Sequence, residues 1–138
     1  MKVLREELAW AAGFYDGEGG LYFKQNQTKV RGLLLVIGQT DIRPLHRFQE
    51  AVGGLGKIYE RSKPKSVKHK QAWVYCVGHF EVVQAVVAMM WPFMSAPKRE
   101  QAVKALARYH ETVANVHLAR SYKVPRGTAK RKRTNANA

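Results

Sequence analysis

The stretch "AAGFYDGEGG", residues 11–20, holds four glycines and two carboxylates, Asp16 and Glu18, at the point where one periodic pattern gives way to another. Before it, apolar residues recur at helical spacing from Val3 to Tyr15. After it, "LYFKQNQ", residues 21–27, alternates as a strand does. The stretch therefore predicts a helix that ends at glycines and passes directly into a strand.

The rest of the chain extends this pattern to a complete domain. Strands are predicted at 21–27, 31–39, 57–61 and 71–77, and helices at 3–15, 40–54, 80–91 and 97–118. Thr40 or Asp41 can cap the second helix, and Gly53 and Gly54 can stop it. The order α-β-β-α-β-β-α-α predicts an α+β fold, in which an antiparallel sheet carries its helices on one face.

The chain is long enough for one domain, which we place at 1–120. Ala102, Val103, Leu106, Val113 and Val116 are the positions of the last helix expected to face the core. The remaining segment, 121–138, carries six basic residues and no acidic one, including "KRKR" at 130–133. This composition is typical of a flexible basic tail.

The charge of the chain points to a polyanionic partner. Lys and Arg number 24 and Asp and Glu only 10, which gives a net charge of +14. Nucleic acid is the first candidate, and an anionic membrane surface or an acidic protein are the alternatives. A basic ribosome-associated protein would have a similar charge.

Cysteine content and hydropathy favour a soluble, intracellular protein. Cys76 is the single cysteine, so neither an internal disulfide nor a cysteine zinc site can form. The most apolar run, 82–94, is too short to span a bilayer, and Glu6 and Glu7 interrupt the N-terminal segment where a signal peptide would be apolar.

The two carboxylates of the opening stretch need a compensating charge. The carbonyl groups at a helix C-terminus already carry partial negative charge, so an acid there is unfavourable unless a cation offsets it. Mg²⁺ accepts one or two carboxylates together with carbonyls and waters, and Mn²⁺ is a plausible substitute. The simpler interpretation is an ordinary helix-ending turn with Glu18 at the surface.

A second feature of the same helix is a stripe of small residues. Ala9, Gly13 and Gly17 are four residues apart and therefore share one helix face. Such a face permits very close packing of two backbones, against either another copy of the helix or the helix's own sheet.

The segment "AAGFYDGEG", residues 11–19, resembles the motif of the LAGLIDADG homing endonucleases, in the variant whose last acid is glutamate. The predicted element order also resembles that family's domain. One motif in a chain of one domain resembles the homodimeric branch of the family. The resemblance implies that Ala9, Gly13 and Gly17 form a dimer interface, and that Glu18 and the Gly19 carbonyl bind a metal ion near the scissile phosphates. Asp16 would support the helix end.

The resemblance implies two further catalytic residues. Lys98, at the start of the last predicted helix, corresponds to a basic residue near the active-site solvent, and Gln39, at the end of the second strand, to a polar residue beside the attacking water. Each could equally be an ordinary surface residue. The five histidines show no paired metal-ligand spacing, which disfavours a histidine-based metal nuclease.

DNA would be read from the sheet, because a β-ribbon fits the major groove. Period two groups the polar strand residues into sets that share a face. The predicted DNA contacts are Tyr22, Lys24, Asn26, Thr28, Arg31, Lys57, Tyr59, Arg61, Lys63, Gln71, Trp73 and Tyr75. The loop residues Lys65, Lys68 and Lys70 would contact phosphates.

Together these features predict a homodimeric, Mg²⁺-dependent DNA endonuclease that cuts both strands of a long pseudo-palindromic site. The alternative is a relative that has lost cleavage and acts as an intron-splicing maturase on RNA, or as a DNA-binding regulator. The basic ribosome-associated protein remains as a third class. Metal-dependent cleavage of duplex DNA separates the first from the others.

Overall fold

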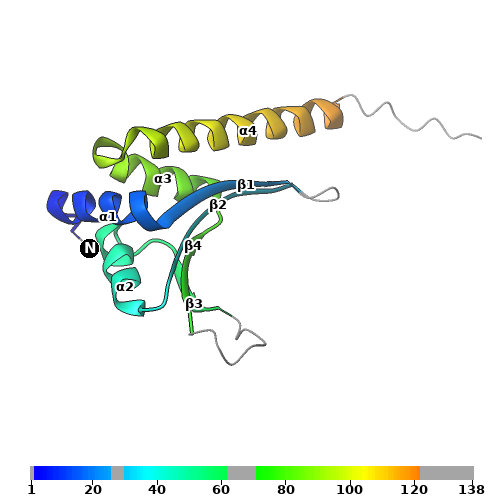
Figure 1. Ribbon diagram of the computed structural model, residues 1–138. Helices are drawn as coiled ribbons and strands as arrows, with labels where there is room; N and C mark the ends of the chain where they lie inside the picture. Colours follow the sequence, from blue (N-terminus) through cyan, green and yellow to red (C-terminus); the bar gives the residue numbers. More distant parts are fainter. Residues whose placement is uncertain (1, 26–29, 62–70, 122–138) are drawn as a thin grey trace, which may run out of the picture.

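Four helices and a four-stranded antiparallel sheet make up the fold (Figure 1). The computed structural model describes residues 2–25, 30–61 and 71–121. In chain order, the elements are α1 (Arg5–Glu18), β1 (Gly19–Gln25), β2 (Val30–Gln39), α2 (Ile42–Ala51), β3 (Lys57–Glu60), β4 (Trp73–Val77), α3 (Phe80–Met90), the short 3₁₀ helix η1 (Trp91–Phe93) and α4 (Ala96–Ser121). The predicted α+β class and element order are confirmed.

The sheet joins two hairpins through its two central strands. Its order is β1-β2-β4-β3, and each neighbouring pair is antiparallel. Gly19 of β1 lies opposite Ile37 of β2, which in turn lies opposite Tyr75 of β4, and Tyr75 lies opposite Ile58 of β3. Because directly opposed residues point to the same side, this row defines one face of the sheet.

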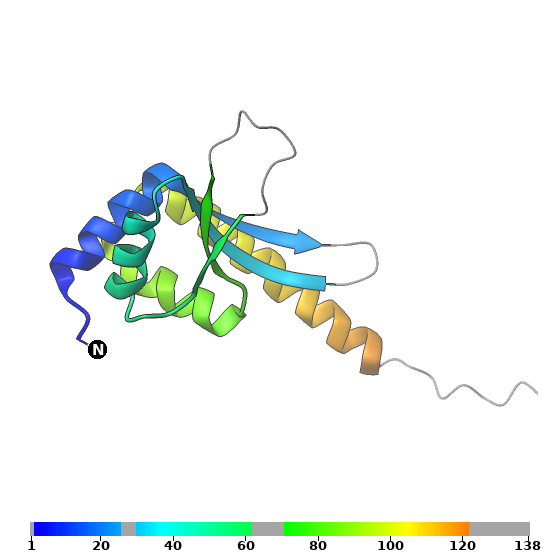
Figure 2. The same cartoon turned by 90° about the horizontal axis from the view of Figure 1, so that it is seen from below.

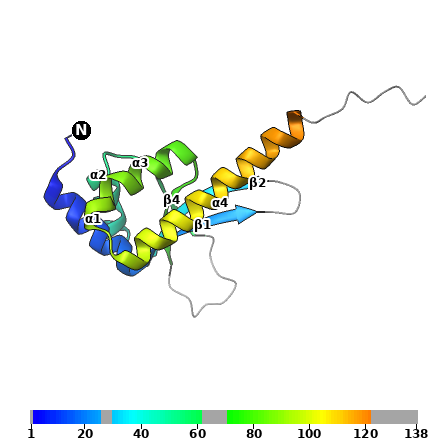
Figure 3. The same ribbon diagram turned by 90° about the horizontal axis from the view of Figure 1, so that it is seen from above.

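That face forms the core with the helices. Its central positions are fully or almost fully buried: Leu33, Leu35, Ile37, Tyr75 and Val77. In Figure 1 the sheet curves and the helices lie on its convex side. Figures 2 and 3, taken from below and above, place α4 behind and in front of the β1–β2 hairpin respectively, so α4 packs along this hairpin. The predicted arrangement of helices on one face is confirmed.

The junction between α1 and β1 contains no loop. The helix continues past the predicted end at Tyr15, through Gly17, to Glu18, and the predicted direct passage from helix to strand takes place at Gly19. Gly19 follows in an extended conformation, and a Cβ there would lie 2.2 Å from the ring of Tyr15. Tyr15 is completely buried, so its ring cannot move aside cheaply. A glycine is therefore required where the helix becomes a strand.

Two details of the other helices bear on the predictions. Asp41 caps α2, because its Oδ1 accepts a hydrogen bond from the Arg43 N–H at 2.9 Å. In α4, Ala102 and Ala105 are buried, whereas Val103 is 55% exposed, so its predicted core position is wrong.

None of the helices in the described ranges combines the length and apolar character of a membrane-spanning segment.

The helix α4 runs to the end of the described chain. The predicted basic tail beyond residue 121 lies outside the described residues, and the boundary at residue 120 stays a prediction.

Candidate nucleic-acid interface and acidic site

The acidic site lies where α1 meets the sheet. Glu18 is the last residue of α1 and is exposed, and Gly19 is the first residue of β1. The carboxylate therefore stands at the negative end of the helix dipole, in contact with solvent. A carboxylate in that position is open to a cation.

Asp16 has a different role, although it lies only two residues away. Its Oδ2 accepts from the Ser95 N–H at 2.9 Å, and its Oδ1 accepts from the Ser95 hydroxyl at 3.0 Å. Ser95 immediately precedes α4, and its carbonyl accepts the Arg99 N–H. Asp16 thus ties the end of α1 to the start of α4, as the resemblance implied for a supporting residue.

Lys98 in the first turn of α4 reaches the same junction. Its Nζ donates a hydrogen bond to the Gly19 carbonyl oxygen and lies 5.4 Å from the centre of the Tyr15 ring. Beneath it, burial raises the pKa of Tyr15, so this phenol is neutral at physiological pH. The junction therefore brings together the exposed Glu18 carboxylate, the Lys98 ammonium and the Gly19 carbonyl that accepts from it.

Gln39 ends β2 at the same end of the sheet. Ile37, two residues before Gln39, pairs with Gly19, the first residue of β1. Gln39 therefore extends beyond the start of β1, on the side where α1 ends. Gln39 itself pairs with Trp73 and is half-buried. The fold thus brings Glu18, Gly19 and Lys98 into one cluster, with Gln39 at the adjoining strand end.

The donors of one chain fit only part of a metal site. Within the described ranges, no three acidic, histidine or cysteine side chains gather as a metal cluster. Glu18 and the Gly19 carbonyl are the oxygen groups that could bind a metal ion at the junction, and Lys98 already donates to that carbonyl. Mg²⁺ typically takes one or two carboxylates and fills its other positions with water or phosphate, so this donor set fits a shared or substrate-completed site.

The small-residue stripe of α1 faces away from the domain. Ala9, Gly13 and Gly17 are all exposed. A Cβ built on Gly13 or Gly17 meets no described atom within 4 Å. The stripe therefore does not pack against the chain's own sheet, which removes one of the two interpretations of its sequence pattern.

The second face of the sheet is open. Its rows are defined by Tyr22 opposite Leu34, by Val36 opposite Cys76 and by Val74 opposite Tyr59. Figure 1 shows it as the concave side, over which no described helix lies. Tyr22 and Tyr59 are 54% and 50% exposed.

Among the residues that the structure describes, the charged side chains of this open face are all positive. Lys24, Lys57 and Arg61 are all exposed and share the parity of the open face. The acid of the described strands, Glu60, pairs with Trp73 on the core side of the sheet. A cationic, aromatic concave surface is the expected footprint of nucleic acid.

Three predicted DNA contacts lie on the other face. Tyr75 is completely buried, and its hydroxyl donates to the Leu55 carbonyl oxygen at 2.7 Å, so its prediction as a DNA contact is wrong. Trp73 shares this face, is half-buried and packs on the core. Gln71 is exposed, but its side chain donates to Glu60.

The remaining predicted contacts lie either in β2 or outside the described residues. Arg31 belongs to β2. Asn26, Thr28, Lys63 and the loop lysines at 65, 68 and 70 lie outside the described residues.

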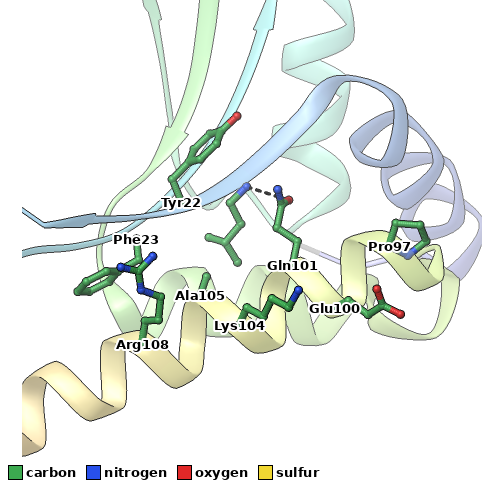
Figure 4. Close-up of a pocket in the computed structure, with 9 residues that line it drawn as sticks. Tyr22, Phe23, Pro97, Glu100, Gln101, Lys104, Ala105 and Arg108 are labelled. Carbon is green, nitrogen blue, oxygen red and sulfur yellow. Dashed lines mark hydrogen bonds between the residues drawn. The ribbon is translucent and has the colours of Figure 1, made fainter.

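Helix α4 lines the outer edge of β1, as Figure 4 shows. The side chain of Gln101 accepts a long hydrogen bond, 3.4 Å, from the Leu21 N–H, and the Arg108 guanidinium lies 5.6 Å from the centre of the Phe23 ring. Lys104 and Arg108 also border a hollow of about 420 Å³ between this helix and β1. The free edge of β1 is therefore protected by side chains of α4.

Sequence reasoning missed Ser95 and Gln101. Ser95 could have been found, because a serine followed by proline within three residues is a helix-start signal. Gln101 has no local signal, since its partner Leu21 is 80 residues away.

The fold of this chain recurs in proteins of known structure. The homing endonuclease I-CvuI in complex with its target superposes with a TM-score of 0.57 at 19% identity, over 74% of this chain and 65% of that chain. The LAGLIDADG meganuclease I-AabMI bound to uncleaved DNA gives a TM-score of 0.61 at 18% identity, over 83% of this chain and 39% of that chain. The chain has the LAGLIDADG homing endonuclease fold.

A third solved structure gives a similar match, and the sequence comparisons give none. The group I intron-encoded homing endonuclease I-CeuI complexed with DNA matches with a TM-score of 0.54 at 18% identity, over 80% of this chain and 55% of that chain. The chain spans less than two thirds of the length of each of these three LAGLIDADG structures. I-CvuI has been solved with DNA in the presence of calcium and of magnesium. The sequence matches no protein-family model and no curated protein.

Proposed function

We propose that this chain is one subunit of a homodimeric, Mg²⁺-dependent DNA endonuclease. It would recognise a long pseudo-palindromic duplex and cut both strands. The observation that carries the proposal is the exposed carboxylate of Glu18, which ends a helix with an open glycine stripe and adjoins a cationic concave sheet. The LAGLIDADG fold, shared with proteins solved on DNA, supports this interpretation.

The homodimer is proposed to form through α1. Ala9, Gly13 and Gly17 leave the backbone of α1 accessible along one stripe, so a second α1 can approach closely. Two such helices would bring two Glu18 carboxylates to one place and align two concave faces on one duplex. Dimerisation would therefore complete both the catalytic site and the DNA-binding surface.

Each residue of the acidic site would have a distinct task. Glu18 and the Gly19 carbonyl would hold the metal ion, which when bound supplies a polarised phosphate and an activated water. Lys98, held at the Gly19 carbonyl, would place its positive charge where negative charge develops on the phosphate. Gln39 would orient the attacking water from the strand end.

The DNA contacts would come from the open face and its edges. Tyr22, Lys24, Lys57, Tyr59 and Arg61 share that face and are exposed. Lysine and arginine can donate to guanine or neutralise phosphates, so these residues would contribute both readout and affinity. Arg31, Asn26, Thr28 and Lys63 remain predictions from the sequence.

Sequencing both the bound duplexes and the cut ends of a randomised library, with a structured RNA as competitor, tests the proposal. The wild-type protein is incubated with Mg²⁺, with Ca²⁺ and with no divalent ion, beside a Glu18→Gln variant. We expect discrete double-strand breaks at one pseudo-palindrome with Mg²⁺ alone and only for the wild type. Selection of one site without cleavage in any arm would instead indicate the DNA-binding regulator. Preference for a structured RNA over every duplex would indicate the maturase.

A further inference from the structure

The open face of the sheet contains an apolar patch at its centre. We define it as Leu34 and Val36 of β2 and Cys76 of β4, all half-buried. None of the three belongs to the core cluster or packs against it. Their neighbour Val74 is 3% exposed and is also absent from that cluster.

The register makes the patch continuous. Val36 lies directly opposite Cys76, and the next position of β2 on the same face is Leu34. Opposed side chains on one face lie about 5 Å apart, so these groups touch or nearly touch. On the β1 side, Val36 lies opposite Gly20, and the ring of Tyr22 lies over this glycine, so Tyr22 borders the patch there.

Hydrogen-bonding residues flank the patch on both sides. Tyr22 and Lys24 of β1 lie along one edge, and Lys57, Tyr59 and the adjoining Arg61 lie along the other. Among the described residues of this face there is no carboxylate. Burial raises the pKa of the Cys76 thiol, which is therefore uncharged near neutral pH.

An apolar centre between cationic edges is the arrangement expected for a surface that binds duplex DNA. A protein or lipid surface could cover apolar side chains, but phosphates on both sides of a groove are a property of duplex DNA. Within the major groove, the C5-methyl group of thymine is the apolar feature that an aliphatic side chain contacts. The methyl group of 5-methylcytosine occupies the same position on its ring.

We infer that Leu34, Val36 and Cys76 read C5-methyl groups of pyrimidines in the major groove, while the flanking strands read or neutralise polar groups. This inference rests on the proposed DNA binding and specifies how the centre of each half-site is recognised. At the base pairs under the patch, thymine and 5-methylcytosine would be accepted, whereas uracil and unmodified cytosine would be penalised.

Methyl removal within the selected site tests this directly. The full chain first selects duplexes from a randomised library in Ca²⁺, and the strongest sequence is then synthesised with deoxyuridine replacing each thymine singly. We expect a block of about two to three base pairs in each half-site where each replacement weakens binding. The affinity should fall by about three- to fivefold per replacement, because burial of one methyl group contributes that factor. At cytosines within that block, 5-methylation should strengthen binding by a similar factor.

A Val36→Gln variant assigns the effect to the patch. Glutamine pairs with adenine through two hydrogen bonds, so this variant should lose the deoxyuridine penalty at one base pair and gain adenine there. Val103→Gln, on the exposed side of α4, is the matched control and should keep the wild-type pattern. Melting temperatures of both variants establish that they are folded.

The outcomes separate the inference from the proposed function. A deoxyuridine penalty that is confined to a block and is lost in Val36→Gln supports the inference. Tight, selective binding that is indifferent to every deoxyuridine replacement, or a penalty retained in Val36→Gln, overturns it and leaves the endonuclease proposal standing. If no duplex is selected at all, both are wrong.

Discussion

The carboxylate of Asp16 accepts hydrogen bonds from both the backbone N–H and the hydroxyl of Ser95, at 2.9 and 3.0 Å. The last turn of α1 is thereby fixed to the start of α4. Three residues further along, Lys98 donates to the Gly19 carbonyl. Two neighbouring acids thus differ in role, since Asp16 is engaged within the fold and Glu18 is exposed.

Replacing these two acids should separate stability from function. Asp16→Ala leaves the part-buried Ser95 N–H without its acceptor, so we expect the free energy of unfolding to fall by about 1–3 kcal/mol. Glu18→Gln removes a charge from a helix C-terminus, where it was unfavourable, so stability should stay the same or rise slightly. Urea unfolding of both variants measures this. Equal destabilisation by the two changes would contradict the division of roles.

A larger side chain at Gly13 should dissociate the proposed dimer. A Cβ at position 13 meets no described atom of its own subunit within 4 Å, but the leucine side chain of Gly13→Leu would separate two α1 helices that pack backbone to backbone. Because glycine is a poor helix former, the folded subunit should not lose stability. Sedimentation equilibrium should give the dimer mass for the wild type and the monomer mass for the variant.

Ala107→Leu is the control for the added hydrophobic surface. Ala107 is exposed on α4, away from the α1 stripe, so this change should leave the dimer intact. A wild type that is monomeric on its selected DNA would contradict the dimer, and a Gly13→Leu protein that stays dimeric would place the interface elsewhere.

Two tyrosines distinguish the faces of the sheet. Tyr75→Phe removes the donor to the Leu55 carbonyl inside the fold, so stability should fall by about 1–2 kcal/mol with DNA affinity unchanged. Tyr59→Phe changes an exposed residue of the open face, so DNA affinity should fall with stability unchanged. Urea unfolding and fluorescence anisotropy on the selected duplex measure the two quantities. Loss of affinity in Tyr75→Phe alone would reverse the assignment of the faces.

The error at Tyr75 shows what a strand pattern can and cannot predict. Period two correctly grouped Gln71, Trp73 and Tyr75, but it does not say which face of the sheet a group occupies. The decision comes from register, because Tyr75 lies opposite Ile37 and Ile58 across two strands. In "WVYCV" every residue is apolar or aromatic, so the sequence offered no polar contrast to decide it.

The end of α1 shows a similar limit. Glycine lowers helix propensity at each position, so Gly17, Gly19 and Gly20 predicted an end near Tyr15. The helix instead reaches Glu18, because the buried Tyr15 anchors the last turn against the core. Tertiary packing overrode the local preference, and it placed Glu18 at the helix end rather than beyond it.

The candidate site was predictable only in part. Glu18 and Gly19 stand in a local motif, so their neighbourhood could be inferred from the sequence together with a family resemblance. The contact between Lys98 and Gly19 depends on the hydrogen bonds between Asp16 and Ser95, which position the start of α4. Asp16 and Ser95 are 79 residues apart, so no local sequence signal predicts that they meet. Leu34 and Val36 were hidden in "LLLVI", where a continuous apolar run masks its two faces.

The reactivity of Cys76 should report occupancy of the open face. Burial raises the pKa of this thiol, so at pH 8 its thiolate fraction, and hence its rate of alkylation by iodoacetamide, should be below that of glutathione. The rate should continue to rise with pH above the range in which glutathione levels off. Selected duplex DNA should slow the reaction further, because Cys76 lies opposite Val36 and Lys57 on the face proposed to bind it. Mass spectrometry of the intact protein measures the rate, and protein in urea, where DNA should give no protection, is the control. If the selected duplex binds tightly but alkylation of the folded protein proceeds at an unchanged rate, then DNA does not cover the centre of this sheet.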